Sequence, residues 1–314
     1  LSKLHKIFHI SSFYFLTITI NSKKTNMEGF YMKKQPFWRN IKVVPYLYIL
    51  PNMILFMMFM IIPIFMTFYY SLMEWNGIGV PQFMKLDNYI WMLTNKVFWK
   101  TVWNTVLYTA MTVPLIMVLA LFLAMLLNTN LPLKGIFRSS LYLPAVVSTV
   151  VVGMVFTWLF QDQVGLINYI LNIFSFKSIK WANDPRFAML MLVAGTVWQR
   201  TGYNMVIYLA GLQGIPADYY EAAVMDGANA WQKFRYITFP LLRTTHVFVL
   251  ITCIIYSFRS FDLVYTMTKG GPLNSTKTLV MYIYEMGFVK NQYGRAACAG
   301  VILFLVMVGL TAVQ

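Results

Sequence analysis

The sequence predicts an all-α membrane protein with six transmembrane helices. Composition is the first observation, since 59% of the 314 residues are hydrophobic and only 11% are charged, against roughly 25% charged residues in globular chains. The second is that long uncharged stretches separate the charges. The third observation is the excess of positive charge, since the chain has 25 Lys and Arg but only 10 Asp and Glu, a formal net charge of +15. These observations exclude a water-soluble fold, and cations between apolar stretches are typical of a multi-pass protein of the cell membrane rather than a nucleic-acid binder.

Each predicted span is an apolar stretch long enough to cross the bilayer. A hydrocarbon core about 30 Å thick needs roughly 20 residues of helix. The cleanest stretches are free of formal charge between Lys42 and Glu74, Lys100 and Lys134, and Arg138 and Asp162. We expect spans at residues 46–72, 102–127 and 139–160, then at Phe187–Leu212, Leu241–Tyr265 and Ala296–Gln314. Charges interrupt the fourth and fifth spans, which indicates that these two face a protein interior or a wet cavity.

Positive charge sets the predicted orientation. Segments on the cytoplasmic side carry an excess of Lys and Arg close to the membrane. Residues 1–42 include Lys23, Lys24, Lys33, Lys34, Arg39 and Lys42, so we expect this amino-terminal segment to be cytoplasmic. Six spans then return the carboxyl terminus to the cytoplasm and place the connection 212–240 on the same side.

The first 26 residues permit two interpretations. Ile7–Ile20 is an apolar run with the length of a signal-peptide core, but no small-residue cleavage site follows it. One interpretation is an over-extended amino terminus, since the chain begins with Leu, and Met27 or Met32 would each give a basic cytoplasmic start. The other is an extra interfacial helix.

Several enzyme and cofactor motifs are missing from the chain. There is no GxxxxGK[ST] phosphate-binding loop, no HExxH and no GxSxG, so we expect neither an enzyme nor a subunit that binds ATP itself. Cys253 and Cys298 lie in apolar segments without a metal-ligand spacing and are expected to be buried core residues. We therefore expect no cofactor and no metal site.

The connection Leu212–Pro240 predicts a helix, a turn and a second helix. Pro216 suits a first helical position, and Asp218 places negative charge in the first turn, where the helix dipole favours it. Gly227 can adopt the left-handed conformation that ends a helix, and Asn229 can cap the next one. A polar hairpin of this kind between two spans is either a solvated loop or a binding element.

The residue spacing in this hairpin matches a known signature. Glu221, Ala222 and Ala223 are followed after three residues by Gly227, after nine more by Ile237, and then by Phe239 and Pro240. The pattern resembles the cytoplasmic signature of permease subunits of binding-protein-dependent ABC importers, with Phe239 where the signature has Leu. The resemblance implies an ABC transporter type I transmembrane domain over residues 43–314, with residues 212–240 as the coupling loop that inserts into an ATPase subunit.

The resemblance assigns the ATPase contact to nine residues: Glu221, Ala222, Ala223, Asp226, Gly227, Trp231, Phe234, Ile237 and Pro240. Small alanines allow a partner to approach closely, Glu221 offers a charge-assisted contact, and Gly227 sets the angle between the two helices. Trp231, Phe234 and Ile237 recur three apart and are expected to share a face. Trp231 and Phe234 are either anchors for the ATPase or packing residues against the membrane domain.

A second region, Phe258–Gly300, narrows the resemblance to sugar importers similar to the maltose and glycerol-phosphate systems. The matching pieces are Phe261 with Asp262, the turn Thr268–Pro272, Thr276, Ile283 with Tyr284, and Tyr293 with Gly294. Gly270, Gly271 and Pro272 predict a tight turn on the outer side. This turn is either purely structural or a contact for an extracellular solute-binding protein.

Polar and aromatic residues of the fourth and fifth spans are candidates for the translocation path: Gln199, Arg200, Asn204, Phe258, Arg259, Phe261, Asp262 and Tyr265. Arg259 and Asp262 are three apart on the predicted fifth span and should lie on one helix face. They form either an internal ion pair or part of the path, where Phe258, Phe261 and Tyr265 could stack on a sugar ring.

The resemblance implies a permease subunit that forms half of the path of an ATP-driven importer for a sugar or related carbohydrate. Its expected partners are ATPase subunits that bind the ATP, a second homologous permease, an extracellular solute-binding protein, the sugar and membrane lipid. The main alternative is a secondary transporter driven by an ion gradient, which predicts internal repeats and broken helices near the bilayer midplane. The sequence shows no repeat of its second half in its first.

Overall fold

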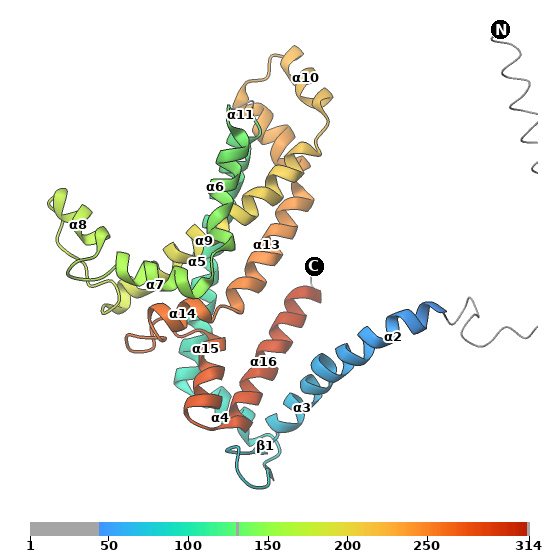
Figure 1. Ribbon diagram of the computed structural model, residues 1–314, viewed down its shortest axis with the longest axis vertical. Helices are drawn as coiled ribbons and strands as arrows, with labels where there is room; N and C mark the ends of the chain where they lie inside the picture. Colours follow the sequence, from blue (N-terminus) through green and yellow to red (C-terminus); the bar gives the residue numbers. More distant parts are fainter. Residues whose placement is uncertain (1–43, 130–131, 313–314) are drawn as a thin grey trace, which may run out of the picture. The chain divides into compact units, whose positions relative to one another are not determined.

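The computed structural model describes residues 44–129 and 132–312, and the elements along this part of the chain are mainly helices (Figure 1). The predicted amino-terminal segment 1–42, with both interpretations of residues 1–26, lies outside the described residues. The chain divides into two units, one up to Ile64 and one from Phe65 onward.

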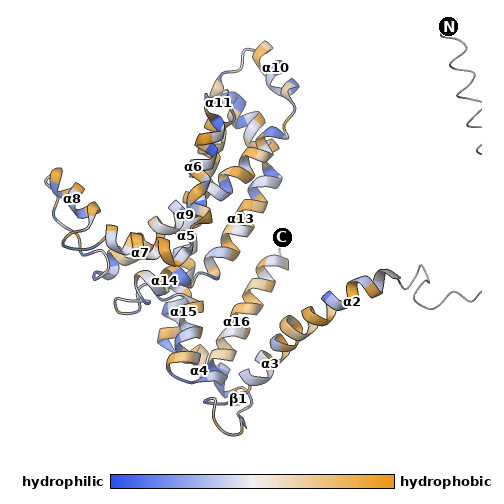
Figure 2. Cartoon of the chain, in the orientation of Figure 1, coloured by the Kyte–Doolittle hydropathy of each residue, from blue (hydrophilic) through white to orange (hydrophobic). Residues whose placement is uncertain are grey.

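The first predicted span corresponds to three consecutive helical segments. They are α2 (Val44–Phe56), the π-helical segment η2 (Met57–Ile61) and α3 (Ile62–Ser71), and they include an apolar stretch of 26 residues, Tyr46–Ser71. Hydrophobic residues cover most of α2 (Figure 2). A helix that is apolar on all sides requires lipid or protein around it, as expected for a membrane span.

The second unit continues with a short hairpin and a long helix. Strands β1 (Met73–Glu74) and β2 (Gln82–Phe83) pair antiparallel, and α4 (Asp87–Thr94) precedes α5 (Lys96–Leu127). The Asn95 side chain begins α5 by accepting hydrogen bonds from the backbone N–H groups of Val97 and Phe98. Helix α5 contains the second predicted span and extends beyond it.

The third predicted span, 139–160, is not one straight helix. It consists of α6 (Lys134–Val146) and α7 (Thr149–Leu159), which meet at an angle of 95°. Val147 and Ser148 are extended between them, so the helical ladder stops there. The prediction of a continuous helix is therefore wrong, because the break lies in an uncharged stretch that the spacing of charges does not reveal. Helix α8 (Leu166–Ile173) follows in the next connection.

The fourth predicted span is one continuous helix, α9 (Pro185–Gln213). Asp184 caps it by accepting a hydrogen bond from the Arg186 backbone N–H, and Pro185 occupies its first turn. Helix α9 packs on α5, α6 and α13. At Gly202 a Cβ atom would lie 1.9 Å from the Leu141 carbonyl oxygen, so this glycine allows the backbones of α6 and α9 to touch.

The fifth predicted span, 241–265, is broken at both ends. The segments before it are α10 (Ala217–Met225), α11 (Ala230–Lys233), the π-helical η3 (Phe234–Thr238) and α12 (Phe239–Leu241). The helical stretch Ala230–Leu241 is bent by 67° from α13 (Arg243–Phe258). Helix α14 (Asp262–Met267) is separate from α13. A continuous helix to Tyr265 is therefore a wrong prediction.

The chain ends with α15 (Leu279–Tyr284), the π-helical η4 (Glu285–Val289) and α16 (Tyr293–Ala312). Among the described residues, three helical stretches are long and apolar enough to cross a membrane: Tyr46–Ser71, Lys96–Leu127 and Tyr293–Ala312. The number is five if each bent pair counts as one span. Length and composition thus support three to five spans, and α9 is not among them.

Three buried clusters hold the second unit together. One joins α5, α9 and α13, and includes Tyr208, Leu242 and Cys253. Another joins α7, α9 and α14, and the last joins α4, α5, α15, η4 and α16 around Tyr282 and Cys298. Both cysteines are free and buried, as predicted.

Candidate functional site

The hairpin between α9 and α13 has the local structure that its sequence predicts. Helix α10 ends at Met225 with Asp226 as its C-cap, and Gly227 follows with a φ of +75°. A Cβ atom at Gly227 would meet nothing within 4 Å, so its left-handed conformation rather than crowding favours glycine. Asn229 begins α11 with a capping box, in which its side chain and that of Gln232 bond each other's backbone N–H groups at 2.9 and 2.8 Å.

One side of the hairpin is anchored. Ala223 is buried, and the Tyr220 hydroxyl lies 2.9 Å from the Thr238 hydroxyl. Phe234 contacts the cluster of α5, α9 and α13, and its ring lies 5.5 Å from that of Trp231. The hairpin is therefore packed against the cluster that holds α5, α9 and α13 together.

The other side of the hairpin is open. Glu221, Ala222, Asp226 and Pro240 are exposed, while Ile237 is half-buried. Trp231 is 68% exposed and Met225 87% exposed. Exposed aromatic and methionine side chains beside charged ones are typical of a protein-binding surface. Of the predicted coupling residues, Ala223 and Phe234 thus pack inward, and the exposed members are available to a partner.

The polar residues of α9 lie along its contacts with α7 and α13. Gln199, 2% exposed, donates hydrogen bonds from Nε2 to the Val147 carbonyl oxygen at 3.0 Å and to the Thr149 hydroxyl at 3.2 Å. The Arg200 guanidinium lies 3.4 Å from the ring centroid of Tyr256 on α13, a cation–π contact. Gln199 thus satisfies the backbone where α6 ends and α7 begins.

Asn204 makes the second polar link between α9 and α13. Its side chain donates to the Arg200 carbonyl oxygen at 2.9 Å, and it accepts a 3.5 Å hydrogen bond from the Cys253 thiol. Buried polar groups with partners fix the register of packed helices.

Arg259 and Asp262 do not share a helix face. Arg259 follows the last residue of α13, and Asp262 begins α14. Both are exposed, and no ion pair joins them among the salt bridges of residues 44–129 and 132–312. Of the two interpretations of Arg259 and Asp262, the internal ion pair is therefore contradicted, because the helix breaks between them. Phe258 is half-buried, and the rings of Phe261 and Tyr265 stack at 5.4 Å.

This break is stabilised by residues that the sequence analysis missed. Tyr108 on α5 is fully buried, and its hydroxyl lies 2.6 Å from that of Thr196 and 3.3 Å from that of Ser260. The Thr278 hydroxyl donates to the Ser260 carbonyl oxygen at 2.9 Å. A polar stripe on α5 at intervals of three and four residues (Thr101, Thr105, Tyr108 and Thr112) was a signal that could have revealed this face.

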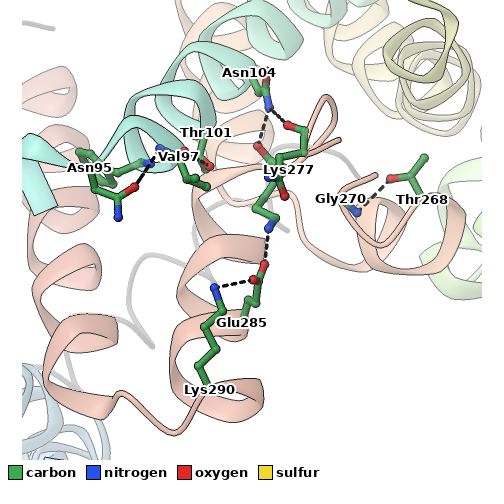
Figure 3. A network of polar contacts seen from close by, with 11 residues as sticks. Asn95, Val97, Thr101, Asn104, Thr268, Gly270, Lys277, Glu285 and Lys290 are labelled. Atoms are coloured by element: carbon green, nitrogen blue, oxygen red, sulfur yellow. Dashed lines mark hydrogen bonds and ion pairs between the residues drawn. The ribbon is translucent and has the colours of Figure 1, made fainter. Parts of the chain in front are cut away.

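The predicted tight turn Thr268–Pro272 belongs to a larger polar network (Figure 3). Gly270 has a φ of +82°. Asn104 on α5 donates hydrogen bonds to the carbonyl oxygens of Asn274 and Lys277 at 2.7 and 3.1 Å. The turn and the segment after it are thus attached to α5.

An ion pair joins this network to η4. The Lys277 side chain, only 8% exposed, pairs with Glu285, and Lys290 lies 2.9 Å from the same carboxylate. Burial alone would raise the pKa of Glu285, but hydrogen bonds from the two lysines hold that pKa below its usual 4.5. Glu285 therefore carries negative charge at neutral pH.

Comparisons with known proteins agree with this arrangement. Residues 116–314 match the family described as binding-protein-dependent transport system inner membrane component. The chain is 36% identical to the arabinooligosaccharides transport system permease protein AraP of Bacillus subtilis, over 87% of this chain and 89% of that protein. It is 32% identical to the trehalose/maltose transport system permease protein MalF of Thermococcus litoralis, over 85% of this chain and 91% of that protein.

The fold is shared with solved structures. A chain of a bacterial alginate ABC transporter, solved with an alginate pentasaccharide-bound periplasmic protein, superposes with a TM-score of 0.75 at 21% identity. The alignment covers 88% of this chain and 94% of that chain. Proteins of the matched family are membrane components of transporters rather than enzymes. The chain belongs to the family of binding-protein-dependent transport system inner membrane components, the permease subunits of ABC importers.

Proposed function

We propose that this chain forms half of the translocation path of an ATP-driven importer for a sugar or related carbohydrate. In this proposal six spans cross the membrane: α2 to α3, α5, the bent pair α6 and α7, α9, α13, and α16. Both chain termini and the hairpin from α10 to α12 lie in the cytoplasm. The observation that carries the proposal is the hairpin itself, which presents the Glu221 signature on an exposed surface while its other side is packed on α5, α9 and α13.

The hairpin is the coupling element to an ATPase in this proposal. Gly227 turns the chain between α10 and α11 in a left-handed conformation, and the capping box of Asn229 holds the start of α11, so that α10 would pass a force on to Phe234. Phe234 passes that force to the cluster that contains Leu242, directly before α13, and Leu212 of α9. Closure of two ATPase subunits would thereby tilt α9 and α13 and alternate access to a central site.

The sugar would contact the polar and aromatic residues on α9 and at the end of α13. Arg200 and Tyr256 lie together on these helices, and Arg259 and Asp262 are exposed where α13 ends. Charged and amide groups bind sugar hydroxyls, and aromatic rings cover the apolar face of a sugar. The permeases AraP and MalF to which the chain is similar are named for arabinooligosaccharide and trehalose/maltose transport, which supports a carbohydrate substrate.

Partner subunits complete the transporter. ATPase subunits bind the ATP, so this chain requires no cofactor of its own, and a second homologous permease supplies the other half of the path. An extracellular solute-binding protein delivers the sugar. The alginate transporter with the same fold was solved with such a periplasmic protein, which supports this last partner.

Reconstitution tests the driving force. The chain, its partner permease and the ATPase subunits are placed in proteoliposomes with the solute-binding protein, and uptake of labelled maltose, lactose and an arabino-oligosaccharide is measured. We expect at least one sugar to enter only when ATP is present on the ATPase side. Uptake by the purified chain alone, driven by a sodium or proton gradient, would instead establish the secondary transporter.

Two substitutions test the coupling role of the hairpin. Glu221→Lys reverses the exposed charge, and Gly227→Pro removes the left-handed conformation that its φ of +75° requires. We expect both to abolish ATP-driven uptake while the chain still inserts in the membrane. Asp218→Lys is the matched control, since Asp218 is exposed on the same helix outside the signature, and should retain uptake. Normal uptake in both test variants would refute the coupling assignment.

A further inference from the structure

Six aromatic side chains form an unbroken series of ring contacts in the second unit: Trp75, Tyr293, Phe288, Tyr284, Tyr265 and Phe261. The centroid distances are 5.4 Å from Trp75 to Tyr293, 6.3 Å on to Phe288 and 5.5 Å on to Tyr284. Tyr284 then lies 5.4 Å from Tyr265 and 5.0 Å from Phe261. We call this series the aromatic ladder. It connects the loop after β1 with α16, η4, α15 and α14.

Two hollows adjoin the ladder and share Trp75. A pocket of about 230 Å³ is lined in part by Trp75, Phe288 and Tyr293. A second pocket, of about 400 Å³, has Trp75 in its wall among polar side chains: Glu74, Asn76, Gln82, Asn291, Gln292 and Arg295. The ladder therefore borders two hollows at its Trp75 end, one of which is lined mainly by polar side chains.

The ladder is only partly buried, because Phe261 and Tyr284 pack against the buried cluster of α7, α9 and α14 while other rings are exposed. Phe288 is 69% exposed and Tyr265 39% exposed, whereas Tyr108 and Tyr282 are fully buried. At its inner end the ladder reaches Phe261, next to the exposed side chain of Asp262. Hydroxyl groups on three of the rings, and charged groups at both ends, are poorly suited to lipid chains.

The same combination of groups is suited to a sugar. The C–H groups on a face of a sugar ring are apolar and pack on aromatic rings, while its hydroxyls need amides, carboxylates and tyrosine hydroxyls as partners. Ring centroids 5.0 to 6.3 Å apart allow a sugar to contact the next ring before it leaves the last. Successive weak contacts of this kind guide a ligand without trapping it.

We propose that the aromatic ladder is the route by which a sugar passes from the polar pocket beside Trp75 to the break between α13 and α14. This proposal rests on the proposed function and extends the candidate path to four further rings, those of Trp75, Tyr293, Phe288 and Tyr284.

Cysteine labelling in the complete transporter tests where the ladder faces. The native Cys253 and Cys298 are buried, so the background is low. The variants Phe288→Cys and Tyr265→Cys are compared with Trp103→Cys, a matched control because Trp103 is 64% exposed on α5 outside the ladder. Because thiolates form in water rather than in lipid, a charged thiol reagent should label both ladder positions about tenfold faster than the control.

Protection by sugar completes the labelling test. Binding protein loaded with maltose, lactose or an arabino-oligosaccharide, whichever the reconstituted wild type imports, should slow labelling at Phe288→Cys and Tyr265→Cys. Labelling by lipid-soluble reagents only would show a lipid-facing surface, and no labelling would show a subunit interface. Either result overturns the proposal, as does labelling that no transported sugar slows.

Sugar uptake by variants of the ladder residue Phe288 distinguishes a failure of the ladder proposal from a failure of the proposed function. Phe288→Ala should reduce ATP-driven sugar uptake about two- to twelvefold, the equivalent of one lost aromatic contact, whereas Phe288→Tyr and Trp103→Ala should match the wild type. If the wild type imports no sugar with ATP, the proposed function fails. If the wild type imports normally and Phe288→Ala does too, the ladder proposal alone fails.

Discussion

The side-chain amide of Gln199 on α9 donates a 3.0 Å hydrogen bond to the backbone carbonyl oxygen of Val147, at the point where α6 and α7 meet at 95°. A helix that stops inside an apolar segment leaves carbonyl groups without partners, and each is costly to bury. Gln199 provides the missing donor. The bend in the third span thus depends on a residue about fifty positions away in the chain.

Removal of this donor should destabilise the bend. Gln199→Leu leaves the Val147 carbonyl oxygen without its side-chain partner, and we expect a loss of about 1 to 3 kcal/mol in the free energy of unfolding. Gln161→Leu is the control, since Gln161 is exposed, and should change stability by no more than about 0.5 kcal/mol. Thermal unfolding of the purified complex measures both. Equal melting temperatures for the two variants would show that the hydrogen bond is dispensable.

The contact between α6 and α9 should not tolerate a methyl group at Gly202. A Cβ atom there would lie 1.9 Å from the Leu141 carbonyl oxygen, whereas a Cβ atom at Gly309 on α16 meets nothing within 4 Å. Gly202→Ala must therefore push the two helices apart, which should lower the free energy of unfolding by about 1 to 3 kcal/mol or more. Both folded yield and uptake should fall as a result. Gly309→Ala should leave both unchanged. Comparable yields of the two variants would contradict the packing.

The Lys277–Glu285 pair should stabilise the segment between the turn Thr268–Pro272 and η4 only while both partners are present. Glu285→Ala leaves the Lys277 ammonium buried without its carboxylate. We expect the free energy of unfolding to fall by up to about 3 kcal/mol. This is the low end for buried ion pairs, because the Glu285 side chain is 20% exposed.

The double variant Lys277→Met, Glu285→Leu should recover most of that stability, since apolar replacement of both partners removes the unpaired charge. Lys290→Ala should have little effect because Lys290 is 45% exposed. If the double variant were as unstable as Glu285→Ala, the unpaired charge of Lys277 would not be the cause of the instability.

The same pair predicts a dependence on pH. The pKa of Glu285 in the folded protein lies below 4.5, the value of a free glutamate. Its pairing with Lys277 therefore stabilises the fold fully above pH 4.5 and is lost as the pH falls through the folded pKa. The difference in melting temperature between wild type and Glu285→Gln should be constant from neutral pH down to about pH 5 and then shrink. If the difference in melting temperature between wild type and Glu285→Gln instead grew as the pH fell, the ion pair could not be its cause.

Local chemistry allowed the hairpin to be predicted in detail. Gly227 and Asn229 act on their immediate neighbours, so a short window of sequence contains all the information that the turn and the cap require. The long helices were predictable for a similar reason, since an uncharged stretch longer than the bilayer is itself a local property.

The breaks in the helices were not predictable because their causes are distant in sequence. Gln199 satisfies the backbone of the bend between α6 and α7, and Thr278 with Tyr108 satisfies Ser260 where α13 ends. Neither break contains a proline or glycine between its two helices, which are the residues that reveal a helix end locally. Pro144 is the one such residue close to the first break, and it lies inside α6, which continues to Val146. The spacing of Arg259 and Asp262 therefore predicts a shared helix face, whereas the two residues lie on either side of the break.

The most direct test of the account is whether the tip of the hairpin contacts an ATPase subunit. Met225→Cys places a single reactive thiol at a position that is 87% exposed, while Cys253 and Cys298 remain buried. A thiol-attached photocross-linker in the complete transporter should join Met225→Cys to the ATPase subunit. Leu273→Cys, which is 79% exposed and which the proposed topology places on the extracellular side, should give no such product. A product with the ATPase from Leu273→Cys and none from Met225→Cys would contradict the account.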